Sequence, residues 1–157
     1  MTQPRTKVVT LSGKKFELRR LPPEVGSYIF IRMLGARMRM QQATAEAAPT
    51  KPVDTTAPPA PPPSGEDLVK ALSFVVFSSA ASFDEFKFMQ SSCMKVTSLI
   101  ENREGMDFPM PLMSDDGQWT RGVGETVSLD VGLLTTLASE VLVLCFADFF
   151  EDRVPGS

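Results

Sequence analysis

Few side chains in this 157-residue sequence could carry chemistry, because it contains no histidine and only two cysteines. Without histidine there is no Ser-His-Asp or Cys-His nucleophile, and no His-ligated zinc or haem. The two cysteines, Cys93 and Cys145, are too few for a four-thiolate metal site. Both lie in apolar helical patterns, so we interpret them as small buried hydrophobes in a reducing compartment rather than as reactive thiols.

Paired carboxylates are the remaining candidates for acid–base catalysis, and they occur at Asp84–Glu85 and Asp115–Asp116. Acidic residues in the first turn of a helix explain the first pair, and a turn that includes Gly117 explains the second. No histidine or ligand cluster accompanies either pair. We therefore predict that the protein is not an enzyme and that it uses no cofactor and no metal.

The charges are unevenly distributed along the chain, although the formal net charge is only −3. Residues 1–42 contain nine Lys and Arg residues and two acidic residues, and the rest of the chain is acidic overall. The basic segment could pack on the acidic remainder, or it could bind nucleic acid. We favour the first interpretation and predict no nucleic-acid partner, because the segment has few aromatic residues and no recognition motif.

The elements that position these residues are predicted to be mostly helices. Residues 8–11 and 16–19 predict two strands joined by a turn at Gly13, and Pro22-Pro23 ends the second strand. Helices are predicted over about 23–42, 65–78, 83–102 and 129–150, with Ser64, Ser82 and Ser128 as the N-caps of the last three.

Residues 103–127 are predicted to be an irregular excursion between the last two helices. It contains a small hairpin that joins 112–113 to 119–120, with Trp119 packed on the helices. The fold class that follows is mainly α. We predict a small bundle of about four helices with an N-terminal β-hairpin and a small hairpin before the last helix.

Residues 43–64 form a Pro/Ala-rich segment that divides the chain. It holds seven of the thirteen prolines and one large apolar residue, Val53. This composition predicts a flexible linker, and we favour a spacer over a proline-rich ligand for a recognition domain. We predict that residues 1–42, with the hairpin and first helix, pack with the helical part, 65–157, as one domain.

The last predicted helix, 129–150, is apolar on all sides. Such a helix lies at the centre of a core or is enclosed by a partner. Glu140 and Asp148 interrupt it, and no stretch reaches the ~18 consecutive apolar residues that span a membrane. Because the N terminus also shows no signal-peptide pattern, we predict a soluble cytoplasmic protein without a membrane partner.

Several apolar residues fall outside the predicted inward faces of the helices, and we predict that they bind a partner protein. The first helix carries a second apolar stripe on the side away from Ile29 and Met33, so this helix is either buried on both sides or leaves one stripe for a partner. Nine methionines, several of them on helices, would make such a surface adaptable. The candidate partner-binding residues are Phe30, Ile31, Leu34, Met38, Phe88, Leu99, Phe146, Phe149 and Phe150.

Two stretches resemble the tail assembly chaperones of long-tailed bacteriophages. Residues 8–22 (VVTLSGKKFELRRLP) resemble the opening of that family, where a short hairpin leads to Leu-Pro and a helix. Residues 137–150 (LASEVLVLCFADFF) resemble its ending, where a helix closes on paired phenylalanines. The middle is similar in the order of its elements, whereas the segment 43–64 departs from the family pattern.

The resemblance implies a non-enzymatic viral chaperone that works in the cytoplasm of the host bacterium. Such proteins bind the helical, hydrophobic tape measure protein and keep it soluble while tail tube subunits polymerise around it. They then leave, so this chain would be absent from the mature virion. The tape measure protein is the expected partner, with the tail tube protein as a second. The alternative is a structural subunit retained in the phage tail or neck, and the sequence leaves the homo-oligomeric state open.

Overall fold

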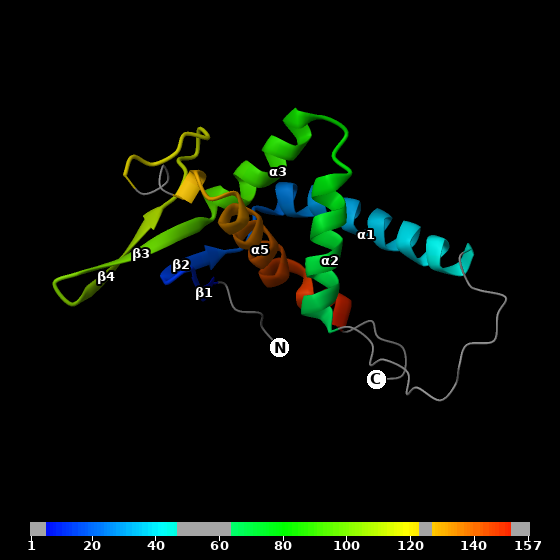
Figure 1. Ribbon diagram of the computed structural model, residues 1–157, viewed down its shortest axis with the longest axis horizontal. Coiled ribbons are helices and arrows are strands. Elements are labelled where there is room, and N and C mark those ends of the chain that lie inside the picture. Colours follow the sequence, from blue (N-terminus) through cyan, green and yellow to red (C-terminus); the bar gives the residue numbers. More distant parts are fainter. Residues whose placement is uncertain (1–5, 47–63, 123–126, 152–157) are drawn as a thin grey trace.

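Two β-hairpins that form one sheet, together with four helices, are the main elements of the described part of the chain. The computed structural model describes residues 6–46, 64–122 and 127–151. The strands form one antiparallel sheet in the order β1-β2-β3-β4. In chain order the elements, shown in Figure 1, are β1 (Thr6–Leu11), β2 (Lys14–Arg19), α1 (Pro23–Glu46), α2 (Gly65–Ser78), α3 (Phe83–Lys95), β3 (Thr97–Arg103), β4 (Met106–Pro111) and α5 (Val131–Glu151).

The predicted N-terminal hairpin is confirmed. β1 and β2 pair over their whole length across a two-residue turn. Both turn residues, Ser12 and Gly13, have a positive φ (53° and 75°), as a type I′ turn requires. Alternate residues of β2 face the helices, so Phe16 and Leu18 are fully buried.

The predicted third helix, 83–102, is wrong in its second half. α3 ends at Lys95, and the residues that follow form β3, which pairs with both β2 and β4. Val96 and Ile100 have the four-residue spacing of a helix, yet both are β-branched and also favour a strand. Pairing with β2, which is itself anchored in the core, decides between the two patterns.

The start of the predicted irregular excursion, 103–127, is also a strand. β4 follows β3 through the turn Glu104-Gly105, whose residues both have a positive φ. Pro109 and Pro111 break a helix but are tolerated here, because β4 is an edge strand. The predicted fold class, mainly α, is therefore wrong: the described residues are 58% helical and 22% strand, which is a mixed α/β fold.

The predicted helix starts are confirmed at two of three positions. The hydroxyls of Ser64 and Ser82 each accept a hydrogen bond from the backbone N–H three residues later, at 3.1 Å. Ser128 is not the N-cap of the last helix. The carboxylate of Asp130 takes that role and accepts a hydrogen bond from the N–H of Leu133 at 3.0 Å.

The predicted small hairpin before α5 is confirmed. Met113 and Trp119 form an antiparallel bridge, and backbone hydrogen bonds flank it on both sides. Trp119 is partly buried against the core, as expected for a residue that holds this loop on the helices.

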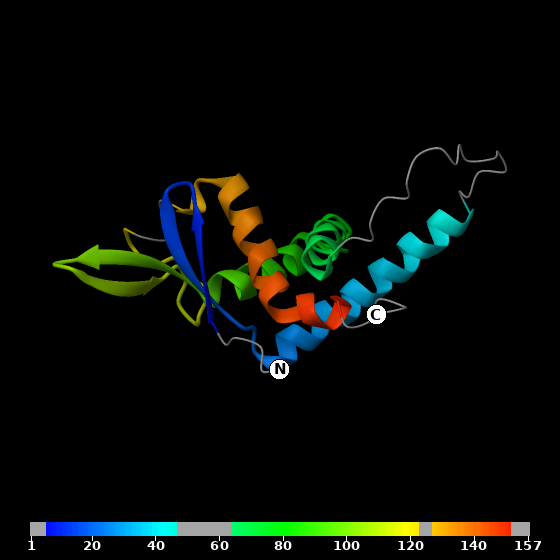
Figure 2. The same ribbon diagram turned by 90° about the horizontal axis from the view of Figure 1, so that it is seen from below.

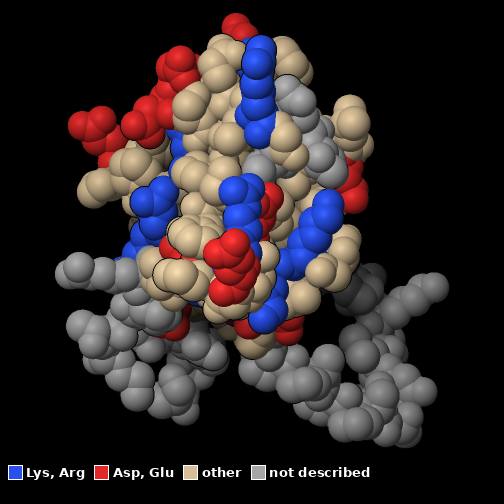
Figure 3. All heavy atoms as spheres, turned by 90° about the vertical axis from the view of Figure 1, so that its left-hand side faces the viewer, with Lys and Arg blue, Asp and Glu red and all other residues tan. Residues whose placement is uncertain are grey.

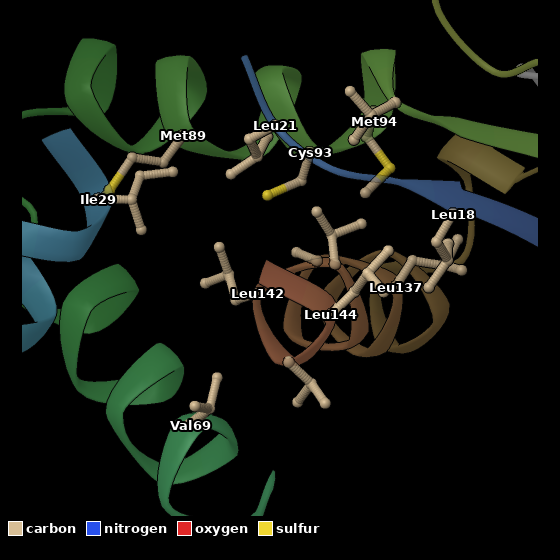
Figure 4. Close-up of a cluster of buried hydrophobic side chains, with 14 of the residues drawn as sticks. Leu18, Leu21, Ile29, Val69, Met89, Cys93, Met94, Leu137, Leu142 and Leu144 are labelled. Atoms are coloured by element: carbon tan, nitrogen blue, oxygen red, sulfur yellow. The ribbon is translucent and has the colours of Figure 1, made fainter. Parts of the chain in front are cut away.

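The helices lie on one face of the sheet, with α5 at the centre (Figures 1 and 2). α5 contacts β1, β2, α2 and α3, and α1 packs on α2 and α3. Figure 4 shows Met89 of α3 beside Ile29 of α1, and Cys93 directed toward α5. Residues from 6–46 and from 64–151 therefore share one hydrophobic core.

α5 is, among the described residues, the one helix long and apolar enough to cross a membrane by length and composition. The central helix of a folded core meets the same criteria. Here Leu137, Val141 and Leu142 are fully buried between the neighbouring helices and the sheet. Its apolar composition is therefore accounted for by packing within the chain.

α1 is longer than predicted and ends at Glu46 instead of about Gln42. Its second half projects past α2 and α3 (Figure 2), and residues 38–43 are exposed. Most of the predicted linker, 47–63, lies outside the described residues. Its first residues, 43–46, belong to α1.

Candidate partner-binding site

An apolar groove runs between α2 and α5 and holds about 500 Å³. Three phenylalanines from α2 and α3 form one side, and short hydroxyl-bearing residues of α2 and α5 form the rest of its walls. One lysine and one glutamate lie at its edge. The groove has the concave, mostly apolar character of a binding site.

The aromatic side of the groove consists of Phe74, Phe77 and Phe86. The rings of Phe77 and Phe86 meet edge to face, with their centroids 5.7 Å apart. Phe74 is 71% exposed. A phenylalanine that remains in solvent at the mouth of an apolar groove is typical of a surface that a partner covers.

The hydroxyl side of the groove is less polar than its composition suggests. Thr135 and Thr136 of α5 donate to backbone carbonyls one turn earlier in the same helix, both at 2.9 Å. Ser73 of α2 donates to the carbonyl of Val69 at 2.7 Å. Because these hydroxyl donors are used within their own helices, the groove demands few polar groups from an occupant.

The charged edge of the groove is neutralised within the chain. Nζ of Lys70 lies 3.1 Å from a carboxylate oxygen of Glu66 and 3.5 Å from one of Glu140. The hydrogen bond with Glu66 raises the pKa of Lys70 above its ordinary value. Lys7 of β1 lies 3.4 Å from the other oxygen of Glu140. An occupant therefore meets a compensated charge cluster at this edge.

Four of the predicted partner-binding residues come together between α1 and α5. The ring of Phe30 lies 4.6 Å from that of Phe149, 5.5 Å from Phe146 and 6.3 Å from Phe150. Phe146 and Phe150 are buried, so their role is in the core rather than at a surface. Phe30, Phe146 and Phe149 also line a shallow cavity of about 360 Å³ beside Leu21.

The other predicted partner-binding residues are dispersed. Ile31 and Met38 are well exposed on α1, at 66% and 61%, and Leu34 is half-buried between them along the chain. Phe88 of α3 is partly exposed and meets Tyr28 edge to face at 5.7 Å. Leu99 belongs to β3, where it pairs with Phe16 of β2. The nine residues therefore do not form one surface.

Phe74, whose ring is exposed, is not among the partner-binding residues predicted from the sequence. A signal was present in the helical spacing. Lys70 lies four residues before Phe74 and Ser78 four residues after it, so the ring shares a face with polar residues. A phenylalanine on such a face marks the boundary of a core or a binding surface.

Catalytic groups are scarce in the structure as in the sequence. The described residues contain no group of three or more His, Cys, Asp or Glu side chains placed to hold a metal ion. Burial raises the pKa of both thiols, Cys93 and Cys145, above the ordinary value. Raised values disfavour the nucleophilic thiolate. Cys93 is fully buried, as interpreted from the sequence, whereas Cys145 is only partly buried.

The basic N-terminal segment is tied to the acidic part of the chain. Nη2 of Arg32 on α1 lies 2.8 Å from Oε1 of Glu85 on α3, and the Lys7–Glu140 pair joins β1 to α5. Figure 3 shows one face of the molecule, on which basic and acidic side chains are interspersed among uncharged ones. These two ion pairs neutralise part of the charge of the basic segment within the chain.

Comparison with known proteins adds no family to these observations. No protein-family model matches the chain. Searches of the curated proteins and of the solved structures gave no match either. The resemblance to tail assembly chaperones therefore remains a prediction from residues 8–22 and 137–150.

Proposed function

We propose that this protein is a non-enzymatic tail assembly chaperone of a long-tailed bacteriophage. It binds the tape measure protein, keeps it soluble in the host cytoplasm while the tail tube assembles, and then leaves. The observation that carries the proposal is the α2–α5 groove with Phe74 exposed at its mouth. The family resemblance supplies the identity of the partner.

The groove suits an apolar helix as its occupant. Helices that dock in grooves insert apolar side chains spaced three or four residues apart. Phe74 and Phe77 offer aromatic contacts for such side chains. Thr135 and Thr136 on the opposite wall are short and carry satisfied hydroxyls, so a helix backbone can approach α5. A long, helical, hydrophobic tape measure protein would present such segments repeatedly.

A chaperone of this kind must also release its client, which calls for moderate affinity. Full burial of one phenylalanine side chain contributes roughly 1.5–3 kcal/mol. A few such contacts, offset by the cost of association, leave a weak and readily reversible interaction. The compensated ion pairs at the edge of the groove add little net attraction.

Co-expression with the tape measure protein from the same genome tests the proposal. We expect the wild-type chain to raise the soluble fraction of that protein, measured by quantitative gel analysis of cleared lysates. Phe74→Ser should abolish the effect, because it removes the exposed ring from the groove. Phe83→Ser is the matched control: Phe83 is 75% exposed at the start of α3, does not line the groove, and should tolerate the change without loss of function.

Two outcomes would count against the proposal. If wild-type chain leaves the solubility of the tape measure protein unchanged, the chaperone function is wrong. If mass spectrometry of purified virions finds the chain in stoichiometric amount, the alternative of a structural tail or neck subunit replaces it. Circular dichroism of both variants must match wild type, so that a misfolded protein is not mistaken for a lost site.

A further inference from the structure

The two edges of the four-stranded sheet differ in their capacity to accept another strand. β1 and β4 are the edge strands. In a two-residue hairpin, the residues that flank the turn form a hydrogen-bonded pair, and the pattern alternates from there. The register of each hairpin therefore fixes which backbone groups point toward the neighbouring strand and which point outward.

The β4 edge is closed to pairing. The N–H of Leu112 bonds inward to the carbonyl of Thr97 at 3.0 Å, so the alternation places residues 107, 109 and 111 outward. Two of these three are Pro109 and Pro111, which have no N–H to donate, and the third is a charged aspartate. Prolines and charges at outward positions are the usual protection of an edge strand.

The β1 edge lacks this protection between Thr6 and Leu11. Leu11 flanks the turn, so Lys7, Val9 and Leu11 bond to β2 and the backbone groups of Thr6, Val8 and Thr10 point outward. The three residues whose backbone groups point outward are all β-branched, and none is a proline. β1 forms the lower edge of the sheet in Figure 1, and no described strand pairs with its outer side.

We propose that the outer edge of β1 pairs with β1 of a second copy of this chain. The two strands run antiparallel about a two-fold axis at Val8, which joins the two sheets into one continuous sheet of eight strands. The interaction is independent of the α2–α5 groove, so it does not rest on the proposed chaperone function.

The sequence of β1 is self-complementary in this register. Val8 faces Val8 of the second copy, and Thr6 faces Thr10 on both sides of the axis. Threonine–threonine pairs are favourable across antiparallel strands, and valine is a residue type that packs well on a sheet. Lys7 faces Val9, so no like charges lie opposite each other. This register also pairs every residue from Thr6 to Thr10 with a residue of the second copy.

The single charge on β1 does not oppose this pairing. Lys7 points to the helix side of the sheet, where its Nζ lies 3.4 Å from a carboxylate oxygen of Glu140 on α5. An inward-facing lysine can protect an edge strand when its charge would be buried without a partner. Here the counter-charge comes from the same chain and stays in place when a second copy binds.

The size of the contact predicts a reversible dimer. One pair of six-residue strands is smaller than a standard interface of ~1,600 Å². We therefore expect sedimentation velocity to show a monomer–dimer equilibrium that shifts with protein concentration. Amide hydrogen exchange by NMR should show the N–H groups of Val8 and Thr10 protected in the dimer and exposed in the monomer.

Val8→Pro tests the edge without disturbing the hairpin. The N–H of Val8 points outward, so its loss removes no hydrogen bond between β1 and β2, and the side chain is 55% exposed. We expect this variant to remain monomeric at concentrations where wild type is dimeric. Val8→Thr is the matched control, because it keeps the N–H and the β-branched side chain and should still dimerise.

Several results would overturn the inference. One is a wild-type chain that stays monomeric at about 1 mM, where even weak specific pairs associate. Another is a dimer that Val8→Pro leaves intact while the variant shows the far-ultraviolet spectrum of wild type, since the contact would then lie elsewhere. Protection of the Val8 and Thr10 amides in the monomer would show that the edge is covered by its own chain.

Discussion

Cys93 packs between α3 and α5, where its thiol is fully buried. Burial raises the pKa of this thiol far above its ordinary value of 9.0, because the thiolate loses its hydration. Burial also raises the pKa of the Cys145 thiol above its ordinary value. Cys93 thus behaves as a packing group, and its raised pKa has a consequence for stability that can be measured.

Stability should fall as the pH rises above about 9, because the unfolded chain then loses the thiol protons that the folded chain retains. The contribution of Cys93 is fully present below its unfolded pKa and is lost as the pH rises toward the folded value. We expect a loss of about 1 kcal/mol between pH 8 and pH 10 from this residue. Urea unfolding under reducing conditions measures it, and Cys93→Ala should show a shallower pH dependence. Parallel curves for the two proteins would contradict the assignment.

α5 is the element on which the rest of the fold depends. The sequence allowed two interpretations of its wholly apolar pattern, a core helix or one enclosed by a partner. In the structure Leu137, Val141 and Leu142 are fully buried by the chain's own helices and sheet. Val131, in contrast, is 74% exposed at the start of the helix. The interior of α5 therefore belongs to the core, whereas Val131, its first residue, does not.

Leu137→Ala should destabilise the protein by about 2–5 kcal/mol, since it leaves a cavity at the centre of the core. Val131→Ala removes an apolar side chain from the same helix at an exposed position and should change stability by less than about 0.5 kcal/mol. Chemical denaturation followed by circular dichroism gives both values. A cost for Leu137→Ala as small as that of its control would show that α5 does not form the core in solution.

The whole molecule is held together by a core that neither half of the chain contains alone. Phe16, Ile29 and Met33 from the first 46 residues pack with Leu72 and Leu137 from beyond residue 64. The ion pairs Lys7–Glu140 and Arg32–Glu85 also cross between these parts. The chain therefore behaves as one cooperative unit, with its N-terminal hairpin and first helix supplying part of the interior.

Separate fragments 1–46 and 64–157 should each fail to fold. Each would leave a large part of its apolar surface in water, because the matching side of the core is on the other fragment. We expect neither to show a cooperative thermal transition, and we expect mixing in equal amounts to restore one. Near-ultraviolet circular dichroism of Trp119 reports the recovery. A cooperative transition in 64–157 alone would contradict the shared core.

Local signals in the sequence determined the features that depend on neighbouring residues. Ser12-Gly13 specified the tight turn of the first hairpin, and Ser64 and Ser82 specified two helix starts. In β2, apolar and charged residues alternate, and the apolar Phe16 and Leu18 are the buried ones. These features follow from backbone geometry and side-chain spacing within a few residues, which a single sequence contains.

Only the tertiary structure decided the second hairpin and the groove. The residues after Lys95 have the spacing of a helix but include β-branched types that favour a strand. β2, some eighty positions away, supplies the hydrogen bonds that make them a strand. The groove likewise needs α2 and α5 side by side before Phe74 lies at its mouth. Strand pairing and the exposure of a side chain depend on groups that are distant in sequence. Local periodicity therefore identifies the apolar residues but does not determine which of them remain exposed to solvent.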